Sequence, residues 1–209
     1  MNNAASPKPE GLRARKRRAT ENAIESSAVR LALELGVDNV TVEAICEKAD
    51  ISRSTFFNYF SARDYAIVGR AITLPEGSEA FAVLDSSPDN LPLGVFRLLF
   101  AAIGHANVNA EVARLRSRLL AEQPQALHLT ISSLLESSYH LSLVTTAWLN
   151  AHPEHAKLDS PETEATLAVT LVHGMVAAYM PIWASRDGDT IAEEGDLLQA
   201  LANYRTVLG

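Results

Sequence analysis

Apolar residues recur along most of the chain at intervals of three and four positions, and this spacing predicts helices. A clear example is the face formed by Val42, Ile45, Cys46 and Ala49. Strict alternation of apolar and polar residues, which would indicate strands, never persists for more than a few positions. The pattern therefore predicts an all-α protein.

Helix caps and breakers divide this pattern into separate segments. Gly36 suits the end of the first helix, whose expected buried face is Ile24, Ala28, Leu31, Ala32 and Leu35. Possible capping boxes run from Ser61 to Asp64 and from Thr190 to Glu193. The predicted helices span residues 13 or 20 to 35, 42–49, 53 to 59 or 60, 62–72, 91–107, 110–121, 125–150, 161–183 and 191–207, with one short helical turn at 79–84.

Residues 41–65 hold the most specific pattern in the chain, which is a short helix, a tight turn and a second short helix. Thr41 and Ser52 can cap the two helices through their hydroxyls. Asp50 tolerates the left-handed conformation that a sharp turn needs. Polar residues open the second helix and aromatic residues follow, which is typical of a helix-turn-helix that reads DNA with its second helix.

The stretch from about residue 15 to residue 70, roughly a quarter of the chain, resembles the DNA-binding domain of TetR-family transcriptional regulators. The residues that carry the resemblance are Ala32, Leu35, Gly36, Thr41, Val42, Ile45, Ala49, Ile51, Ser52, Thr55, Phe56, Tyr59, Phe60 and Arg63. It implies a DNA-binding domain at residues 13–72 with a three-helix helix-turn-helix fold. It also implies a helical effector-binding and dimerisation domain at residues 73–209.

Three side chains of the second short helix are candidates for reading bases. Arg53 can donate a bidentate pair to guanine, Asn58 suits adenine, and Thr55 can contact a thymine methyl group. Ser54 is a further polar candidate. The alternative role for Ser54 and Thr55 is helix capping, and for Arg53 it is a solvated side chain or a phosphate contact.

The aromatic residues of this helix divide into two faces. Phe56 and Phe60 are expected to pack inward, and Phe57 and Tyr59 to point outward. The resemblance implies that Tyr59 bonds a phosphate. Phe57 departs from the Tyr that is commoner there, so its ring is left to pack on a sugar or a thymine methyl group.

The resemblance also implies two backbone contacts outside this helix. Arg63 stands where the family usually has Lys, and it is expected to contact a phosphate together with the positive end of the next helix. Thr41 is a candidate for the same role at the preceding helix. Since one such domain reads only a few base pairs, a dimer on a palindromic double-stranded operator is expected.

Charge is distributed unevenly along the chain. Residues 1–70 hold eleven Lys and Arg against nine Asp and Glu, which gives +2, whereas residues 71–209 hold seven against sixteen, which gives −9. Only the first part therefore suits a polyanion. Its basic residues cluster at Arg13, Arg15, Lys16, Arg17 and Arg18, either as a solvated tail or as an arm that contacts phosphates or the minor groove.

The single cysteine and the N-terminus indicate a cytoplasmic location. Cys46 cannot form an intramolecular disulfide, and its place on an apolar helix face favours a buried structural thiol. The N-terminal segment is polar and basic without an apolar stretch, so no signal peptide is expected.

Residues 165–184 contain no charged residue and are long enough to span a membrane. A buried helix is favoured over a span, because alanine, threonine and His173 dilute the apolar character. In TetR-like proteins the last two long helices form a four-helix dimer interface. Composition and resemblance together place a homodimer contact on residues 161–207, with no membrane.

The resemblance further implies an unknown small-molecule effector that releases the DNA. The aromatic and histidine residues that could line its pocket are Phe96, Phe100, His105, Tyr139, Trp148, His173 and Tyr179, and core packing is the alternative for each. Arg114, Arg116 and Arg118 cannot share one helical face and are expected to be mostly solvated.

No feature of the sequence indicates catalysis or a cofactor. Glycine-rich phosphate loops, nucleophile elbows and cysteine pairs are missing, and the run from His152 to His155 is expected to be a surface loop and not a metal site. The favoured function is a homodimeric repressor. The alternatives are an activator of the same fold and a helical small-molecule-binding or interaction protein without a DNA role.

Overall fold

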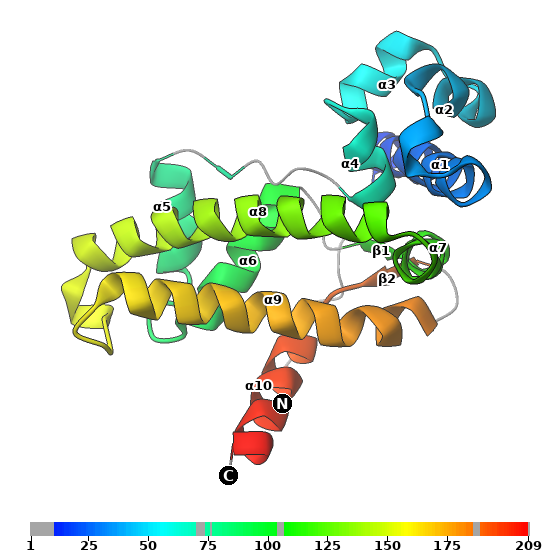
Figure 1. Cartoon of the computed structure of the whole chain (residues 1–209). Helices are drawn as coiled ribbons and strands as arrows, with labels where there is room; N and C mark the ends of the chain where they lie inside the picture. Colours follow the sequence, from blue (N-terminus) through cyan, green and yellow to red (C-terminus); the bar gives the residue numbers. More distant parts are fainter. Residues whose placement is uncertain (1–10, 70–73, 76, 104–106, 186–188, 209) are drawn as a thin grey trace, which may run out of the picture.

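The structure, a computed structural model, describes residues 11–69, 74–75, 77–103, 107–185 and 189–208. Within these ranges the chain is almost entirely helical, which confirms the predicted all-α fold (Figure 1). The buried apolar residues form two cores. One lies mainly among the four N-terminal helices, and the other lies among the longer helices that follow.

The N-terminal group of helices contains the helix-turn-helix. It consists of α1 (Leu12–Leu35), η1 (Val37–Asn39), α2 (Val42–Ala49), α3 (Arg53–Tyr59) and α4 (Arg63–Val68). The expected inward face of α1 is buried at Ile24, Ala28, Leu31 and Ala32. The prediction for Leu35 is wrong, because this side chain is 49% exposed at the last position of α1, where Gly36 turns the chain with a φ of 86°.

The start of α4 differs from the predicted capping box. Ala62 occupies the N-cap position without a side-chain cap, and the Asp64 carboxylate instead accepts a hydrogen bond from Arg63 Nε at 2.9 Å. The helix ends at Val68, since Gly69 has a φ of 123°. The expected extension to residue 72 lies outside the described residues.

The C-terminal group surrounds a long helical hairpin. Its elements are α5 (Ser78–Asp85), α6 (Leu91–Ile103), β1 (Asn107–Asn109), α7 (Ala110–Glu122), α8 (Pro124–Ala151), η2 (Pro153–His155), α9 (Pro161–Ser185), β2 (Asp189–Ile191) and α10 (Glu194–Leu208). The helices α8 and α9 run antiparallel and lie side by side (Figure 1). Both tryptophans, Trp148 and Trp183, are fully buried in the second core.

A short antiparallel ribbon was not predicted. Asn107 pairs with Ile191 and Asn109 with Asp189, so the segment before α7 is joined to the segment before α10. Three-residue strands are too short to show the alternation by which strands are recognised. As a result, α6 ends at Ile103 and not at residue 107, with residues 104–106 outside the described ranges.

The last helix starts later than the Thr190 capping box implied. Thr190 belongs to β2, and α10 begins at Glu194. The Asp196 carboxylate accepts hydrogen bonds from the backbone N–H of Glu193 at 3.2 Å and from Trp183 Nε1 at 3.0 Å. The start of α10 is therefore fixed to the end of α9 by a buried indole.

Helix α7 connects the two groups of helices. Arg116 donates to the Ile67 carbonyl oxygen at 2.8 Å, near the end of α4, and to the Glu25 carboxylate at 2.8 Å. Gln123, next to α7, donates to the Ala32 carbonyl oxygen at 2.7 Å and accepts from the Val37 N–H at 3.0 Å. These side chains hold the ends of α1 and α4 against the C-terminal helices.

The expectation that the arginines of α7 are mostly solvated is wrong for Arg116, which is half-buried, whereas Arg114 and Arg118 are exposed. Besides the contacts of Arg116, Arg114 donates to the Ala184 carbonyl oxygen at 2.7 Å. Only Arg118 is bonded within its own helix, to Glu122. Sequence spacing shows that the three cannot share one face, but it does not show that neighbouring helices flank α7 on more than one side.

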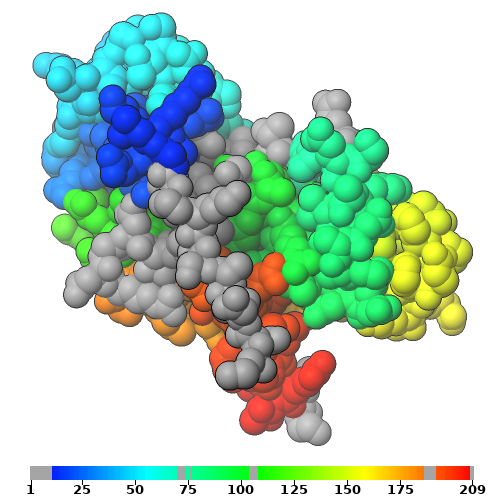
Figure 2. Space-filling view, turned by 180° about the vertical axis from the view of Figure 1, so that it is seen from behind, coloured from blue at the N-terminus to red at the C-terminus, as the bar shows by residue number. Residues whose placement is uncertain are grey.

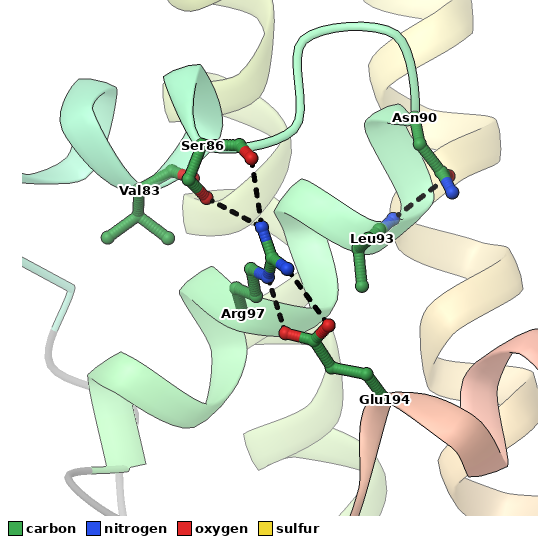
Figure 3. A network of polar contacts seen from close by, with 6 residues as sticks. All are labelled: Val83, Ser86, Asn90, Leu93, Arg97 and Glu194. Carbon is green, nitrogen blue, oxygen red and sulfur yellow. Dashed lines mark hydrogen bonds and ion pairs between the residues drawn. The ribbon is translucent and has the colours of Figure 1, made fainter. Parts of the chain in front are cut away.

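A second polar network joins α5, α6 and α10 (Figure 3). Arg97 Nη1 donates to the carbonyl oxygen and the hydroxyl of Ser86 at 3.0 and 2.9 Å. Arg97 Nε and Nη2 donate to the two oxygens of Glu194 at 2.5 and 2.9 Å. The hydrogen bond from Arg97 lowers the pKa of Glu194, so the ionised carboxylate stabilises the attachment of α10.

We expect Glu194→Gln to lower the free energy of unfolding at pH 7 by less than about 1 kcal/mol, since the pair is partly exposed. Because the pKa of Glu194 is lowered in the folded state, its contribution is present above the usual glutamate range of about 4. It is lost as the pH falls through the folded pKa. Urea unfolding between about pH 6 and pH 3 would measure this loss. The control is Glu193→Gln, and an equal loss in both variants would contradict the assignment.

We expect Gln123→Ala to destabilise the protein by about 1–3 kcal/mol, because it leaves the N–H of buried Val37 without its acceptor. The matched control is Gln125→Ala, an exposed position two residues further along. Urea unfolding followed by far-ultraviolet circular dichroism measures both. A loss no larger than that of the control would show that Gln123 does not connect the two groups.

Candidate nucleic-acid interface

The turn between α2 and α3 has the local geometry that the sequence predicts. Thr41 Oγ1 accepts from the Ala44 N–H at 3.1 Å and caps α2. Asp50 lies in the left-handed region with a φ of 52°, and the Ile51 N–H bonds the Cys46 carbonyl oxygen at 3.0 Å. Ser52 Oγ then accepts from the Thr55 N–H at 3.0 Å. The chain thus leaves one helix and enters the next with its backbone groups paired.

Two phenylalanines fix the orientation of α3. Phe56 and Phe60 are buried, as predicted, with ring centroids 5.9 Å apart. Because inward residues recur every three or four positions in a helix, the opposite face must point to solvent. The exposed residues of α3 are Arg53, Ser54, Phe57 and Asn58, and Thr55 is half-buried.

The small hydroxyl residues at the start of α3 bond one another. Ser52 Oγ lies 2.8 Å from both Ser54 Oγ and Thr55 Oγ1. In the free protein these side chains take part in the helix cap, which was the alternative to base contact. Ser54 is exposed, so its hydroxyl remains accessible to a duplex.

Arg53 has two neighbours that sequence reasoning missed. Its Nη1 forms an ion pair with Glu43 Oε1, from the first turn of α2. Its guanidinium also lies over the ring of Phe57, 5.8 Å from the centroid. The spacing of four residues between Arg53 and Phe57 is a signal for the second contact, whereas the first depends on the angle between α2 and α3.

Tyr59 lies half-buried at the edge of the N-terminal core and not fully outward. The Arg17 guanidinium covers its ring at 5.8 Å from the centroid. The basic cluster from Arg13 to Arg18 belongs to the first turns of α1, so in this structure it is helical rather than a flexible arm. These turns lie at the surface beside the helix-turn-helix (Figure 2).

Arg63 has a structural role that the sequence did not reveal. Its Nη1 donates to the carbonyl oxygens of Asp38 at 3.1 Å and Val40 at 2.5 Å, and its Nε bonds Asp64. The side chain therefore ties the loop before α2 to the start of α4. A phosphate contact would have to use its remaining N–H groups.

Cys46 lies in the N-terminal core, where burial raises the pKa of its thiol. A raised pKa keeps the thiol protonated and poorly nucleophilic. The position agrees with the expected buried structural thiol.

The candidates for an effector pocket differ widely in their exposure to solvent. Phe96 and Trp148 are buried, Phe100 and His173 are half-buried, and Tyr139 is 63% exposed. Trp148 Nε1 donates to the Asp85 carboxylate at 2.7 Å. The Nδ1 atom of His173 lies 2.9 Å from Ser138 Oγ, and burial lowers the pKa of this histidine. His105 lies outside the described residues.

Other residues line two cavities among the described residues. One of about 360 Å³ lies at the turn between α8 and α9, beside Leu149, Pro153, Lys157 and Pro161 among others. A second of about 20 Å³ adjoins Ile67 and Arg116.

The run from His152 to His155 lies at the end of α8, on the face of Trp148. The rings of His155 and Trp148 are stacked, with centroids 5.7 Å apart. Among the described residues, no group of three or more His, Cys, Asp or Glu side chains could hold a metal ion.

Comparison with known proteins agrees with this geometry. Residues 24–64 match the family model of bacterial regulatory proteins of the tetR family. The chain is 27% identical over 132 residues to the HTH-type transcriptional regulator TcmR of Streptomyces glaucescens. That match covers 63% of this chain and 54% of TcmR, so the chain spans about half the length of this relative.

A crystal structure of the multidrug binding protein EbrR complexed with imidazole aligns with 97% of this chain and 96% of its own. Its identity of 16% and TM-score of 0.29 are too low to support an argument. The residues matched by the family model run from the middle of α1 into α4 and include the capped turn and the inward phenylalanines. Residues 24–64 therefore resemble the DNA-binding domain of bacterial regulatory proteins of the tetR family.

Proposed function

We propose that the protein is a homodimeric repressor that binds a palindromic operator through α3 and is released by a small-molecule effector. The observation that carries the proposal is the exposed face of α3, which presents Arg53, Ser54, Phe57 and Asn58 together. In this proposal residues 13–72 bind DNA, and residues 73–209 bind the effector and the second subunit.

We assign base contacts to Arg53, Ser54, Thr55 and Asn58. Arginine and asparagine can each form bidentate hydrogen bonds in the major groove, to guanine and adenine. The small hydroxyl residues allow the start of α3 to approach the bases closely. This role for Asn58 is supported by its exposure on the face that carries Arg53.

We assign phosphate contacts to Thr41, Tyr59 and Arg63, together with the basic first turns of α1. Arg17 lies over Tyr59, so the basic residues of α1 lie close to the end of α3. Neutralising phosphates supplies affinity without sequence preference.

We further propose that the subunits pair through α8 and α9. The sequence analysis placed this contact on residues 161–207, which correspond to α9 and α10, so α8 takes the place of α10 in the proposed contact. The exposed apolar residues of α8 recur on one helical face. They are Leu127, Ile131, Leu134, Leu135, Tyr139 and Leu143. Helix α9 adds Leu167 and Ile182, both exposed. Monomeric proteins rarely leave such a stripe uncovered.

Helix α9 is long and apolar enough to cross a membrane by length and composition. In the 18-residue window that meets this criterion, 28% of residues are buried within the single chain. A second copy of the chain would cover much of the remainder, which supports a protein partner. We therefore place the protein in the cytoplasm and not in a membrane.

We assign effector binding to the C-terminal group. The Thr145 hydroxyl is fully buried in α8 and has no hydrogen-bond partner among the described residues. A buried hydroxyl is costly unless something bonds it, and a polar atom of an effector would do so. Phe96, Phe100, Trp148 and His173 remain the proposed lining residues. A shift of α7 on binding would reach α1 and α4 through Arg116 and Gln123.

An activator would use the same DNA interface and differ only in its effect on transcription. A reporter gene placed behind the selected operator distinguishes the two, because deletion of a repressor raises expression whereas deletion of an activator lowers it.

We expect Arg53→Ala to weaken binding to the operator by about 1–3 kcal/mol, as for the loss of one bidentate base contact. Its preference for guanine at one position should disappear while non-specific binding changes little. Selection from randomised duplexes followed by fluorescence anisotropy measures both. Arg118→Ala, at an exposed position of α7, is the control. Unchanged base preference in Arg53→Ala would contradict base reading by α3.

We expect Leu135→Glu to convert the dimer into monomers, because the substitution places a charge in the proposed apolar contact. Analytical ultracentrifugation at several protein concentrations measures the change. Val207→Glu, at an 83% exposed position on α10, should leave the dimer intact. If Val207→Glu dissociated it and Leu135→Glu did not, the contact would lie on α10 instead.

A further inference from the structure

The guanidinium of Arg53 is held on two sides before any DNA is bound. Glu43 Oε1 engages its Nη1 atom from α2, and the Phe57 ring lies beneath it from the next turn of α3. All three groups are exposed, with about 60% of the Arg53 and Glu43 side chains open to solvent. The arrangement therefore belongs to the surface that would face a duplex.

The carboxylate of Glu43 cannot bind DNA phosphates, because both groups are negatively charged. It lies in the first turn of α2, and a negative charge on a DNA-facing surface opposes binding to a polyanion. Its position is explained if it acts on Arg53. A carboxylate at Nη1 leaves the Nε and Nη2 hydrogens as a donor pair, which matches the two acceptors of guanine.

We infer that Glu43 is a positioning residue that makes Arg53 a selective reader of guanine, with the Phe57 ring as the supporting surface. The inference rests on the proposed role of α3 in reading bases. This role for Phe57 needs no hydroxyl group, which a phenylalanine lacks and the Tyr that is commoner at this position in TetR-like proteins would have.

The strength of the arrangement fits this role. An ion pair between exposed groups is weak, and so is a cation–π contact in water. Together they restrict the rotamers of a long side chain without trapping it, so less conformational entropy is lost when the base is bound. Without Glu43, Arg53 would be free to contact nearby phosphates, and such contacts carry no sequence information.

The test compares Glu43→Gln with Glu47→Gln. Both substitutions remove one negative charge from α2, and both positions are exposed, but only Glu43 contacts Arg53. Affinities are measured for the selected operator and for duplexes in which the guanine assigned to Arg53 is replaced by each other base. We expect the preference for guanine to fall about three- to tenfold in Glu43→Gln. In Glu47→Gln all duplexes should change by the same factor.

A double-variant cycle separates positioning from charge. In an Arg53→Ala background, Glu43→Gln should leave the base preference at this position unchanged. Suppose that the wild-type protein reads guanine through Arg53, but that Glu43→Gln and Glu47→Gln change the base preference equally. That result would overturn the inference and leave the proposed function intact. A wild-type protein that selects no duplex would overturn both.

Discussion

The burial of Phe56 and Phe60 is the constraint on which the DNA interface depends. Phe56 in α3 and Phe60 at its C-cap attach one face of this helix to the N-terminal core. The outward face is then determined, and it carries the arginine and asparagine that can read base edges. Removal of a buried ring of this size typically costs about 3–5 kcal/mol, so the aromatic pair has little freedom to change.

The second constraint acts between the two groups of helices. Arg116 donates to the Ile67 carbonyl oxygen near the end of α4, and Gln123 donates to the Ala32 carbonyl oxygen near the end of α1. The C-terminal helices and the proposed DNA-reading surface are therefore joined through α7.

The sequence predicted those parts of the structure that depend on local chemistry. The bounds of α2, the caps Thr41 and Ser52, and the left-handed Asp50 are confirmed, because each depends on residues within four positions. The predicted capping boxes at Ser61 and Thr190 are wrong. At the first, the Asp64 carboxylate accepts from Arg63 Nε instead. At the second, the Asp196 carboxylate accepts from the Glu193 N–H and from Trp183 Nε1.

Contacts between distant segments could not be predicted, because they do not depend on residues that are close in sequence. The β1–β2 ribbon, the contacts of Arg116 and the pairing of Arg53 with Glu43 join residues whose proximity follows only from packing. The dimer face is an intermediate case. The apolar residues of α8 recur with a helical period in the sequence, but only the structure shows that their face is uncovered. The effector candidates rest on residue type alone, and their burial differs from one to the next.

In the proposed complex, two copies of α3 read two half-sites of one operator. Hydroxyl-radical footprinting of the selected operator tests this arrangement most directly. We predict protected patches on both strands, related by twofold symmetry and separated by about one helical turn or a multiple of it. A single asymmetric patch, or uniform protection without a boundary, would contradict this arrangement.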